Sequence, residues 1–135
     1  MPSHVIPTLR YKDAQKAIDF LVEAFGFKAD NVYTSDDGRV EHAELSFRDG
    51  LVMIGTVADS EFGRLLTTAS EAGKPTQSVY VIVEDAAEHA ATAAAAGAVI
   101  LMPPTLQDYG ATDYTCRDPE GNVWSFGDYD PWAAR

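Results

Sequence analysis

The chain has 135 residues, a length that favours a single domain with a proper hydrophobic core. Its hydrophobic content of 46% argues against a disordered chain, and its formal net charge of -11 argues against nucleic acid and anionic membrane surfaces as partners. The single cysteine, Cys116, excludes an intrachain disulfide and favours a reducing compartment. With neither a signal-peptide pattern nor an apolar run of membrane-spanning length, we expect a soluble cytoplasmic protein.

The first half of the chain is predicted to form a strand, a helix and three further strands. Residues 4–11 alternate between two faces, and a period of two is typical of a strand. Asp13 then caps a helix whose apolar residues recur at intervals of three and four, and Gly26 ends it. A two-residue turn at Asp49-Gly50 is predicted to join the last two strands. The three strands after the helix are predicted at 27–34, 39–48 and 51–57.

The same pattern restarts after a connecting segment in which Phe62, Leu65 and Leu66 suggest one face of a short helix. A strand is expected at 78–83 and a helix from Asp85 to about Ala96. Pro103-Pro104 is predicted to end the strand that follows this helix. The last three strands are predicted at 98–102, 111–117 and 122–127, and Asp118-Pro119-Glu120-Gly121 has the residues of a tight turn.

The chain therefore contains a duplicated strand–helix–three-strand unit. Neither half buries its sheet well alone, so we expect the two halves to pack together. The predicted organisation is one domain, 1–135, with module one at 1–57, a linker at 58–76 and module two at 77–130.

This doubled unit, with its closing segment Arg117 to Gly127, resembles the vicinal oxygen chelate superfamily of glyoxalase I, the bleomycin-resistance proteins and the extradiol dioxygenases. The resemblance covers nearly the whole chain, including the Val79-to-Gly97 segment and the Tyr109-Gly110 step. It implies an α+β fold in which two tandem βαβββ modules form curled mixed sheets around a ligand cavity. Since a fold alone does not specify a reaction, the function needs separate evidence from the site residues.

Metal-using members of this superfamily place ligands on the first and last strands of each module. Carried over residue by residue, these positions fall on Ile6, Met53, Ser78 and Ser125. A divalent site needs three or four histidine, carboxylate or thiolate ligands, and this set supplies none. We therefore expect no metal site and no cofactor. Within the superfamily, the chain is expected to resemble the metal-free bleomycin-resistance-like members most closely. The alternative is a protein that binds a divalent metal.

Residues on the strand faces opposite the helices are expected to line the ligand cavity. Tyr80 and Tyr109 are candidates for stacking on a ligand, although a structural role is equally open for each. Asp113 is either a surface charge or a group that binds a cationic ligand, which the acidic total charge would attract. Trp124, Phe126 and Cys116 fall on the core-facing side. The predicted ligand-binding residues are Thr8, His42, Glu44, Met53, Tyr80, Tyr109, Asp113 and Ser125.

His42 and Glu44 lie two apart on one strand face and are the only weak candidates for catalysis. Three interpretations of this pair are open: an acid/base pair, part of a displaced metal site with His4, or a solvated strand face without a function. We expect a homodimer that sequesters a small aromatic or cationic molecule without metal. The alternatives are a metal-dependent lyase, isomerase or dioxygenase, and a cofactor-free acid/base enzyme, so whether the protein is an enzyme stays open.

Overall fold

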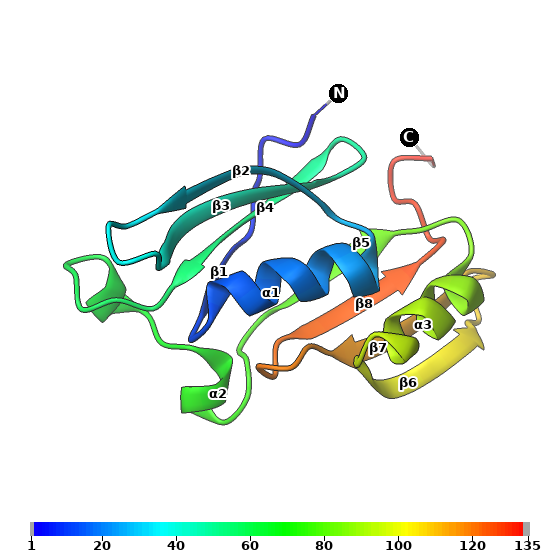
Figure 1. The fold of residues 1–135 in the computed structure, drawn as a ribbon. Helices are drawn as coiled ribbons and strands as arrows, with labels where there is room; N and C mark the ends of the chain where they lie inside the picture. The colour runs from blue at the N-terminus through cyan, green and yellow to red at the C-terminus, as the bar shows by residue number, and fades with distance from the viewer. Residues whose placement is uncertain (1, 134–135) are drawn as a thin grey trace.

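Figure 1 shows the computed structural model, which describes residues 2–133 and arranges them as two modules, each built on a four-stranded sheet. The first module comprises β1 (Thr8–Tyr11), α1 (Ala14–Phe20), β2 (Lys28–Thr34), β3 (Val40–Phe47) and β4 (Gly50–Thr56). The second comprises β5 (Ser78–Ile82), α3 (Ala86–Ala95), β6 (Val99–Leu106), β7 (Thr112–Arg117) and β8 (Val123–Gly127). The linker holds a 3-10 turn, Gly63–Leu65, and the short helix α2 (Ala69–Ala72).

The two sheets share one topology, with strand orders β1-β4-β3-β2 and β5-β8-β7-β6. In each sheet the first strand of the module runs parallel to the last, and the other neighbours are antiparallel. The predicted α+β fold of two βαβββ modules is therefore confirmed. No helix in the described part of the chain, 2–133, is long and apolar enough to span a membrane.

Both module helices begin and end as their sequences predict. The side chain of Asp13 accepts a hydrogen bond from the Lys16 amide at 3.1 Å, and Asp85 caps α3 in the same way. After α1 the chain continues as a π-helical turn, Leu21–Phe25, and then ends at Gly26, whose φ of 85° is the left-handed conformation that favours glycine. These caps fix the directions in which the helices cross their sheets.

The core lies between the helices and the inward faces of the two sheets, and the C-terminal end of the first helix joins them. The Phe25 ring lies 5.3 Å from Trp124 and 4.6 Å from Phe126, measured between ring centroids. His89 on α3 contacts the Phe25 carbonyl through Nε2 at 2.8 Å and bonds the Tyr114 hydroxyl through Nδ1. The two modules therefore share one aromatic core rather than two separate ones.

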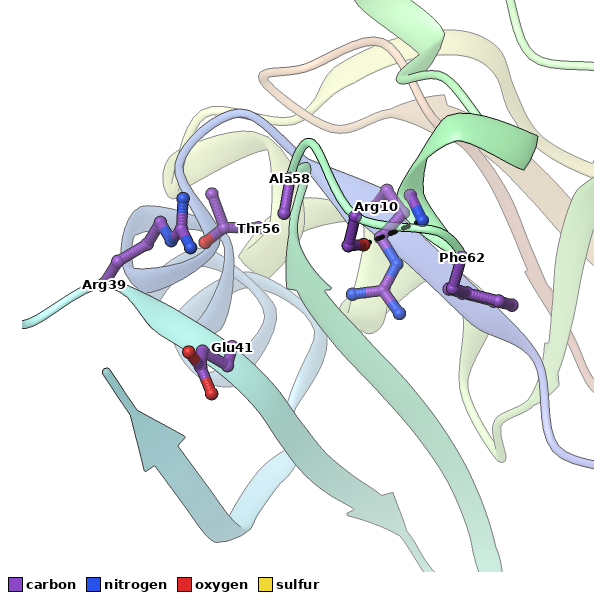
Figure 2. Close-up of a pocket in the computed structure, with 8 residues that line it drawn as sticks. Arg10, Arg39, Glu41, Thr56, Ala58 and Phe62 are labelled. Carbon is purple, nitrogen blue, oxygen red and sulfur yellow. Dashed lines mark hydrogen bonds between the residues drawn. The ribbon is translucent and has the colours of Figure 1, made fainter. Parts of the chain in front are cut away.

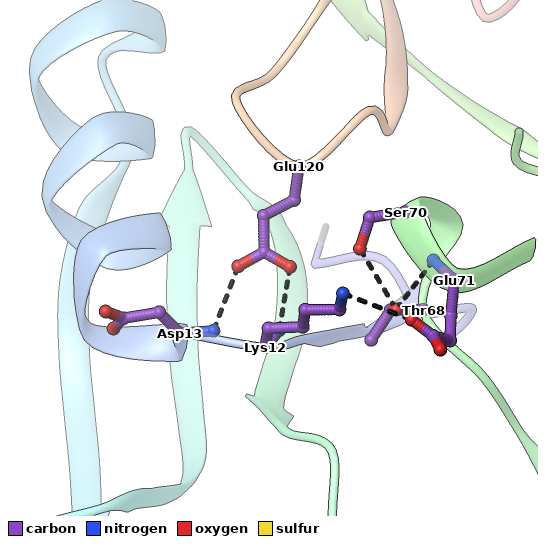
Figure 3. A network of polar contacts seen from close by, with 6 residues as sticks. All are labelled: Lys12, Asp13, Thr68, Ser70, Glu71 and Glu120. Carbon is purple, nitrogen blue, oxygen red and sulfur yellow. Dashed lines mark hydrogen bonds and ion pairs between the residues drawn. The ribbon is translucent and has the colours of Figure 1, made fainter. Parts of the chain in front are cut away.

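The turn Asp118-Pro119-Glu120-Gly121 also ties the modules together. The Glu120 carboxylate accepts hydrogen bonds from the backbone amides of Lys12 and Asp13, at 2.7 and 2.9 Å, at the start of α1 (Figure 3). A carboxylate at this position satisfies free amides and is favoured by the helix dipole. Lys12 pairs in turn with Glu71 of α2 at 3.1 Å (Figure 3). The turn therefore positions the helix of the other module.

Four local predictions were wrong. Pro103 and Pro104 do not end a strand but lie within β6, where the pairing shifts between Met102 and Thr105; β6 is an edge strand, which tolerates proline because one side needs no amide donor. The β3–β4 turn consists of Arg48, whose φ is 54°, and Asp49, while Gly50 already pairs with Phe47.

The third error concerns the linker. Phe62, Leu65 and Leu66 do not form a buried helix face, because the segment makes only a single 3-10 turn and all three side chains are exposed. In addition, the first strand begins at Thr8 rather than at His4, since Pro7 accepts a hydrogen bond from the Met53 amide but has no N–H to continue the pairing.

Candidate ligand-binding site

The eight predicted ligand-binding residues divide into two groups, one in each module. On the first sheet, Thr8 lies opposite Met53 and Met53 lies opposite Glu44 across neighbouring strands. On the second sheet, Tyr80 lies opposite Ser125. All of these strand positions are on the faces that point away from the helices, as the alternation of residues predicts.

The second module gathers Tyr80, Tyr109, Asp113 and Tyr129, which we call the tyrosine–aspartate cluster. One oxygen of Asp113 accepts a hydrogen bond from the Tyr109 hydroxyl at 2.8 Å, and the other accepts one from the side-chain amide of Gln107 at 2.9 Å. The Tyr80 hydroxyl donates to the Tyr129 carbonyl at 2.8 Å. The rings of Tyr109 and Tyr129 meet edge to face, 5.6 Å apart.

Gly127 makes this close grouping possible. A Cβ atom at Gly127 would lie 2.6 Å from Asp113 Cβ and 3.0 Å from the Tyr80 hydroxyl oxygen. Carbon atoms without a bond between them do not approach this closely, so a side chain here would push Asp113 or Tyr80 away. Because Gly127 has no side chain, Asp113 and Tyr80 can both lie next to this position of β8.

The electrostatics of the cluster favour a cation. Burial, together with the charge of Asp113, raises the pKa of Tyr80 to about 12, and the hydrogen bond to Asp113 raises the pKa of Tyr109. Both phenols therefore stay protonated at neutral pH and donate hydrogen bonds. No lysine or arginine within residues 2–133 pairs with Asp113. Exposed aromatic rings beside a carboxylate that has hydrogen bonds but no ion-pair partner within residues 2–133 are a favourable environment for an organic cation.

The first module brings together the two weak catalytic candidates. His42 Nε2 lies 2.9 Å from Glu44 Oε2, and the Asn31 amide donates to the other Glu44 oxygen, also at 2.9 Å. The Tyr33 ring lies against the His42 ring, with 5.9 Å between centroids. The hydrogen bonds from His42 and Asn31 lower the pKa of Glu44. The arrangement holds an oriented imidazole next to a carboxylate on a partly exposed strand face.

A cavity of about 600 Å³ lies where the first strands of the two modules approach each other. This volume falls within the range of about 300–1,000 Å³ that is usual for small-molecule sites. Of the predicted ligand-binding residues, only Thr8 lines it. Ile6 and Ser78, two of the carried-over metal positions, also line it, whereas Met53 and Ser125 do not. The side-chain nitrogen of Asn122, Nδ2, is buried at its edge and makes no hydrogen bond within residues 2–133.

The residues at the four carried-over positions do not fit a divalent metal. Ile6 has no donor atom, Met53 offers only a thioether, and Ser78 and Ser125 offer only neutral hydroxyls, of which that of Ser125 is hydrogen-bonded to Thr115 at 2.8 Å. The displaced set does not assemble either, since His4 does not join His42 and Glu44 in any grouping of three metal-binding side chains within the described range, 2–133. We therefore derive no chemistry through a metal.

The predicted core residues lie in the core. Trp124, Phe126 and Cys116 are completely buried, and burial raises the pKa of the Cys116 thiol to about 12. The thiol is thus protonated and inert at neutral pH. The sequence did not predict four further residues of these sites. Gln107 from a loop and Tyr129 from the C-terminal segment join the tyrosine–aspartate cluster. Asn31 and Tyr33 from the edge strand β2 join His42 and Glu44.

The sequence and the fold match known proteins. The family model described as the glyoxalase/bleomycin resistance protein/dioxygenase superfamily matches residues 3–126. An uncharacterised protein of Mycobacterium bovis is 31% identical over 122 residues, which are 90% of this chain and 80% of that protein.

Solved structures agree with this match. TioX from Micromonospora sp. ML1 is 33% identical, with a TM-score of 0.73 over 93% of this chain and 94% of that one. A superfamily member from Sphaerobacter thermophilus, 22% identical, has the same fold, with a TM-score of 0.70 over 94% of this chain and 97% of that one. The chain therefore belongs to the glyoxalase/bleomycin resistance protein/dioxygenase superfamily.

Proposed function

We propose that the protein binds and sequesters a small organic molecule that carries a cationic group, next to an aromatic or apolar body, at the tyrosine–aspartate cluster. The observation that carries this proposal is the Asp113 carboxylate, which has no cationic partner within residues 2–133 and lies beside partly exposed tyrosine rings. The exposed fractions of Tyr80, Tyr109 and Tyr129 are 41%, 62% and 47%. These rings offer π faces to a cation, and the net charge of -11 attracts it over a longer range.

Sequestration without metal is supported by two further points. The superfamily includes bleomycin resistance proteins, and the positions that hold metal in metal-using members carry Ile6, Met53, Ser78 and Ser125 in this chain. A binding protein needs only a complementary surface, which the cluster supplies through one charge and several rings.

The experiment is a calorimetric titration of the whole protein with three probes of similar size: benzyltrimethylammonium, benzyl alcohol and benzoate. Preference for the cation by about tenfold or more over benzyl alcohol supports the proposal. The variant Asp113→Asn keeps the shape of the side chain and removes its charge, and Glu44→Gln is the matched control in the other module. Equal binding of the cation and the alcohol would remove the basis of the proposal.

The second candidate is a cofactor-free acid/base enzyme. One observation favours it: His42 lies 2.9 Å from Glu44, and Asn31 holds the carboxylate in place. An imidazole oriented by a carboxylate is suited to proton transfer near neutral pH. A turnover that shows a bell-shaped pH profile, and is lost in both His42→Gln and Glu44→Gln, would favour this candidate over sequestration.

We also propose that the protein works as a homodimer. The edge strand β6 supports this, since Val99, Leu101, Met102 and Leu106 expose apolar side chains along it. Sedimentation analysis of the wild type and of Leu106→Glu tests the proposal: we expect a dimer for the former and a weakened dimer for the latter. A monomeric wild type at micromolar concentration would contradict it.

A further inference from the structure

A second, smaller cavity lies on the first module, between the sheet and the start of the linker, and its volume is about 280 Å³. Figure 2 shows Arg10 and Phe62 on one side of this cavity and Arg39, Thr56 and Glu41 on the other. It is separate from the tyrosine–aspartate cluster, which belongs to the second module. Its lining residues are Arg10, Arg39, Glu41, Thr56, Ala58, Ser60, Phe62 and Gly63.

Arg10 is the unusual residue of this cavity. Its Nε atom is buried and has no hydrogen-bond acceptor, and its guanidinium group makes no ion pair within residues 2–133. The guanidinium group lies over the ring of Phe62, whose centroid is 5.2 Å from Arg10 Cζ. A buried arginine N–H without an acceptor is costly, because the group has lost water and gained no partner.

The fold keeps space for this side chain. A Cβ atom at Gly55 on β4 would lie within 2.1 Å of an Arg10 guanidinium nitrogen, so Arg10 occupies the volume that any other residue would fill. Arg10 also lines the larger cavity between the modules. The guanidinium group therefore lies at the junction of two cavities. It fits there because Gly55 has no side chain, and it packs against the ring of Phe62.

We infer that this cavity binds a small organic anion, a carboxylate or a phosphate monoester, through Arg10. The two terminal nitrogens of arginine form a planar fork of N–H donors that matches two oxygens of a carboxylate or phosphate. An anion here supplies the ion-pair partner that the Arg10 guanidinium group lacks within residues 2–133. The exposed half of the Phe62 ring, which is 52% accessible, offers a surface for the apolar part of the ligand.

The other charges around the cavity adjust this preference. Arg39 adds a second positive charge, which also lies near Asp37: the hydrogen bond from Ser35, and then Arg39 through its backbone amide and its charge, lower the pKa of that carboxyl. Glu41 also lines the cavity and opposes anion binding. The Ser60 hydroxyl accepts a hydrogen bond from the Gly63 amide, so its own hydrogen is free to donate to a ligand. Two arginines against one glutamate leave the lining positive in a chain whose total charge is -11.

The inference does not rest on the proposed function, because the two sites use different residues and opposite charges. Calorimetric titrations with benzoate, phenyl phosphate, benzyl alcohol and benzyltrimethylammonium test it, and the Arg10 Nε–H resonance reports the location by NMR. We expect one or both anions to bind at least about tenfold more tightly than benzyl alcohol and to shift the Arg10 resonance. Comparison of benzoate with phenyl phosphate identifies the preferred anion. Binding of the anions no stronger than that of the alcohol would overturn the inference.

Three variants separate a binding role from a packing role. Arg10→Met keeps the packing against Phe62 without the charge, and we expect it to lose about tenfold or more in anion affinity with an unchanged or raised melting temperature. Arg10→Lys should retain part of the affinity, because it keeps the charge but not the fork. Glu41→Gln should bind the anion about two- to fivefold more tightly, since it removes a like charge. Unchanged anion affinity in Arg10→Met or in Glu41→Gln would contradict the inference even if the other variant failed to fold.

Discussion

The hydroxyl of Tyr11, on the first strand of module one, donates a 2.7 Å hydrogen bond to Asp118 of module two, which lies 107 residues away in the sequence. Asp118 is 3% exposed and also accepts hydrogen bonds from the Trp124 indole and from the amides of Glu120 and Asn122. Asp118 therefore stabilises the turn between the last two strands and also connects this turn to the first module.

Tyr11→Phe should lower the free energy of unfolding by about 1.5–3 kcal/mol, because it removes a buried hydrogen bond to a charged acceptor. Urea denaturation of both proteins measures the difference. Tyr33→Phe is the matched control, since its ring is exposed and its hydroxyl makes no hydrogen bond within residues 2–133. An equal effect in the two variants would show that the Tyr11–Asp118 contact does not stabilise the fold.

The protein should lose stability at alkaline pH. Burial and the Asp118 charge raise the pKa of Tyr11 well above its usual value, and burial raises the pKa values of Tyr80 and Cys116 to about 12. Above the unfolded pKa values, about 8.5 for cysteine and 10 for tyrosine, the unfolded chain releases protons that the folded protein retains. The free energy of unfolding should therefore fall as pH rises from about 9 to 11, and less steeply above about pH 10 in Tyr11→Phe. A flat profile would contradict the burial of these groups.

A second pH effect should come from His89 at the module interface. Burial lowers the pKa of His89 below its usual value, although the Phe25 carbonyl opposes this shift. As pH falls below about 6.5, the unfolded chain binds a proton that the folded protein does not, so stability falls. The groups facing the imidazole from the packed elements are the Tyr114 hydroxyl and the Phe25 carbonyl.

Unfolding experiments between pH 7.5 and 5.5 should show this loss in the wild type and a smaller slope in His89→Gln. His42→Gln is the matched control, because His42 lies on a partly exposed strand face with Glu44. The same change of slope in both variants would mean that acid sensitivity does not originate at the module interface.

Gly127→Ala should weaken binding at the tyrosine–aspartate cluster by about tenfold, because its Cβ displaces Asp113 or Tyr80 from the shared position. Calorimetry with benzyltrimethylammonium measures this change. Gly50→Ala, on β4 of the first module, is the control and should change the affinity little, because a Cβ atom there would come no closer than 3.4 Å to its nearest neighbour, the Phe47 carbonyl oxygen. Unaltered binding in Gly127→Ala would show that the close approach of Asp113 and Tyr80 is not needed.

The sequence predicts the repeat because both modules use the same signals: a period of two, an aspartate cap and a terminating glycine. Alternation also places Tyr80, Asp113 and Ser125 correctly on the face away from the helices, and Trp124 and Phe126 in the core. These features are local, so residue patterns alone determine them.

Features that depend on register or on long-range contact were not predictable. Asn31 and Tyr33 reach Glu44 and His42 only because β2 carries irregularities at two places in its pairing with β3. Pro103 and Pro104 fit a strand only because that strand lies at the sheet edge. The Phe62 ring meets Arg10 because the linker folds back over the first strand, which no pattern in residues 58–76 indicates.

The central claim is that Asp113 attracts a cation to the tyrosine–aspartate cluster. The most direct measurement is the affinity of wild-type protein and Asp113→Asn for benzyltrimethylammonium, by calorimetry at two salt concentrations. We predict saturable binding that weakens about tenfold or more in Asp113→Asn, is unchanged in Glu44→Gln and declines with added salt. Binding that is equally strong in the wild type and in Asp113→Asn would contradict the account.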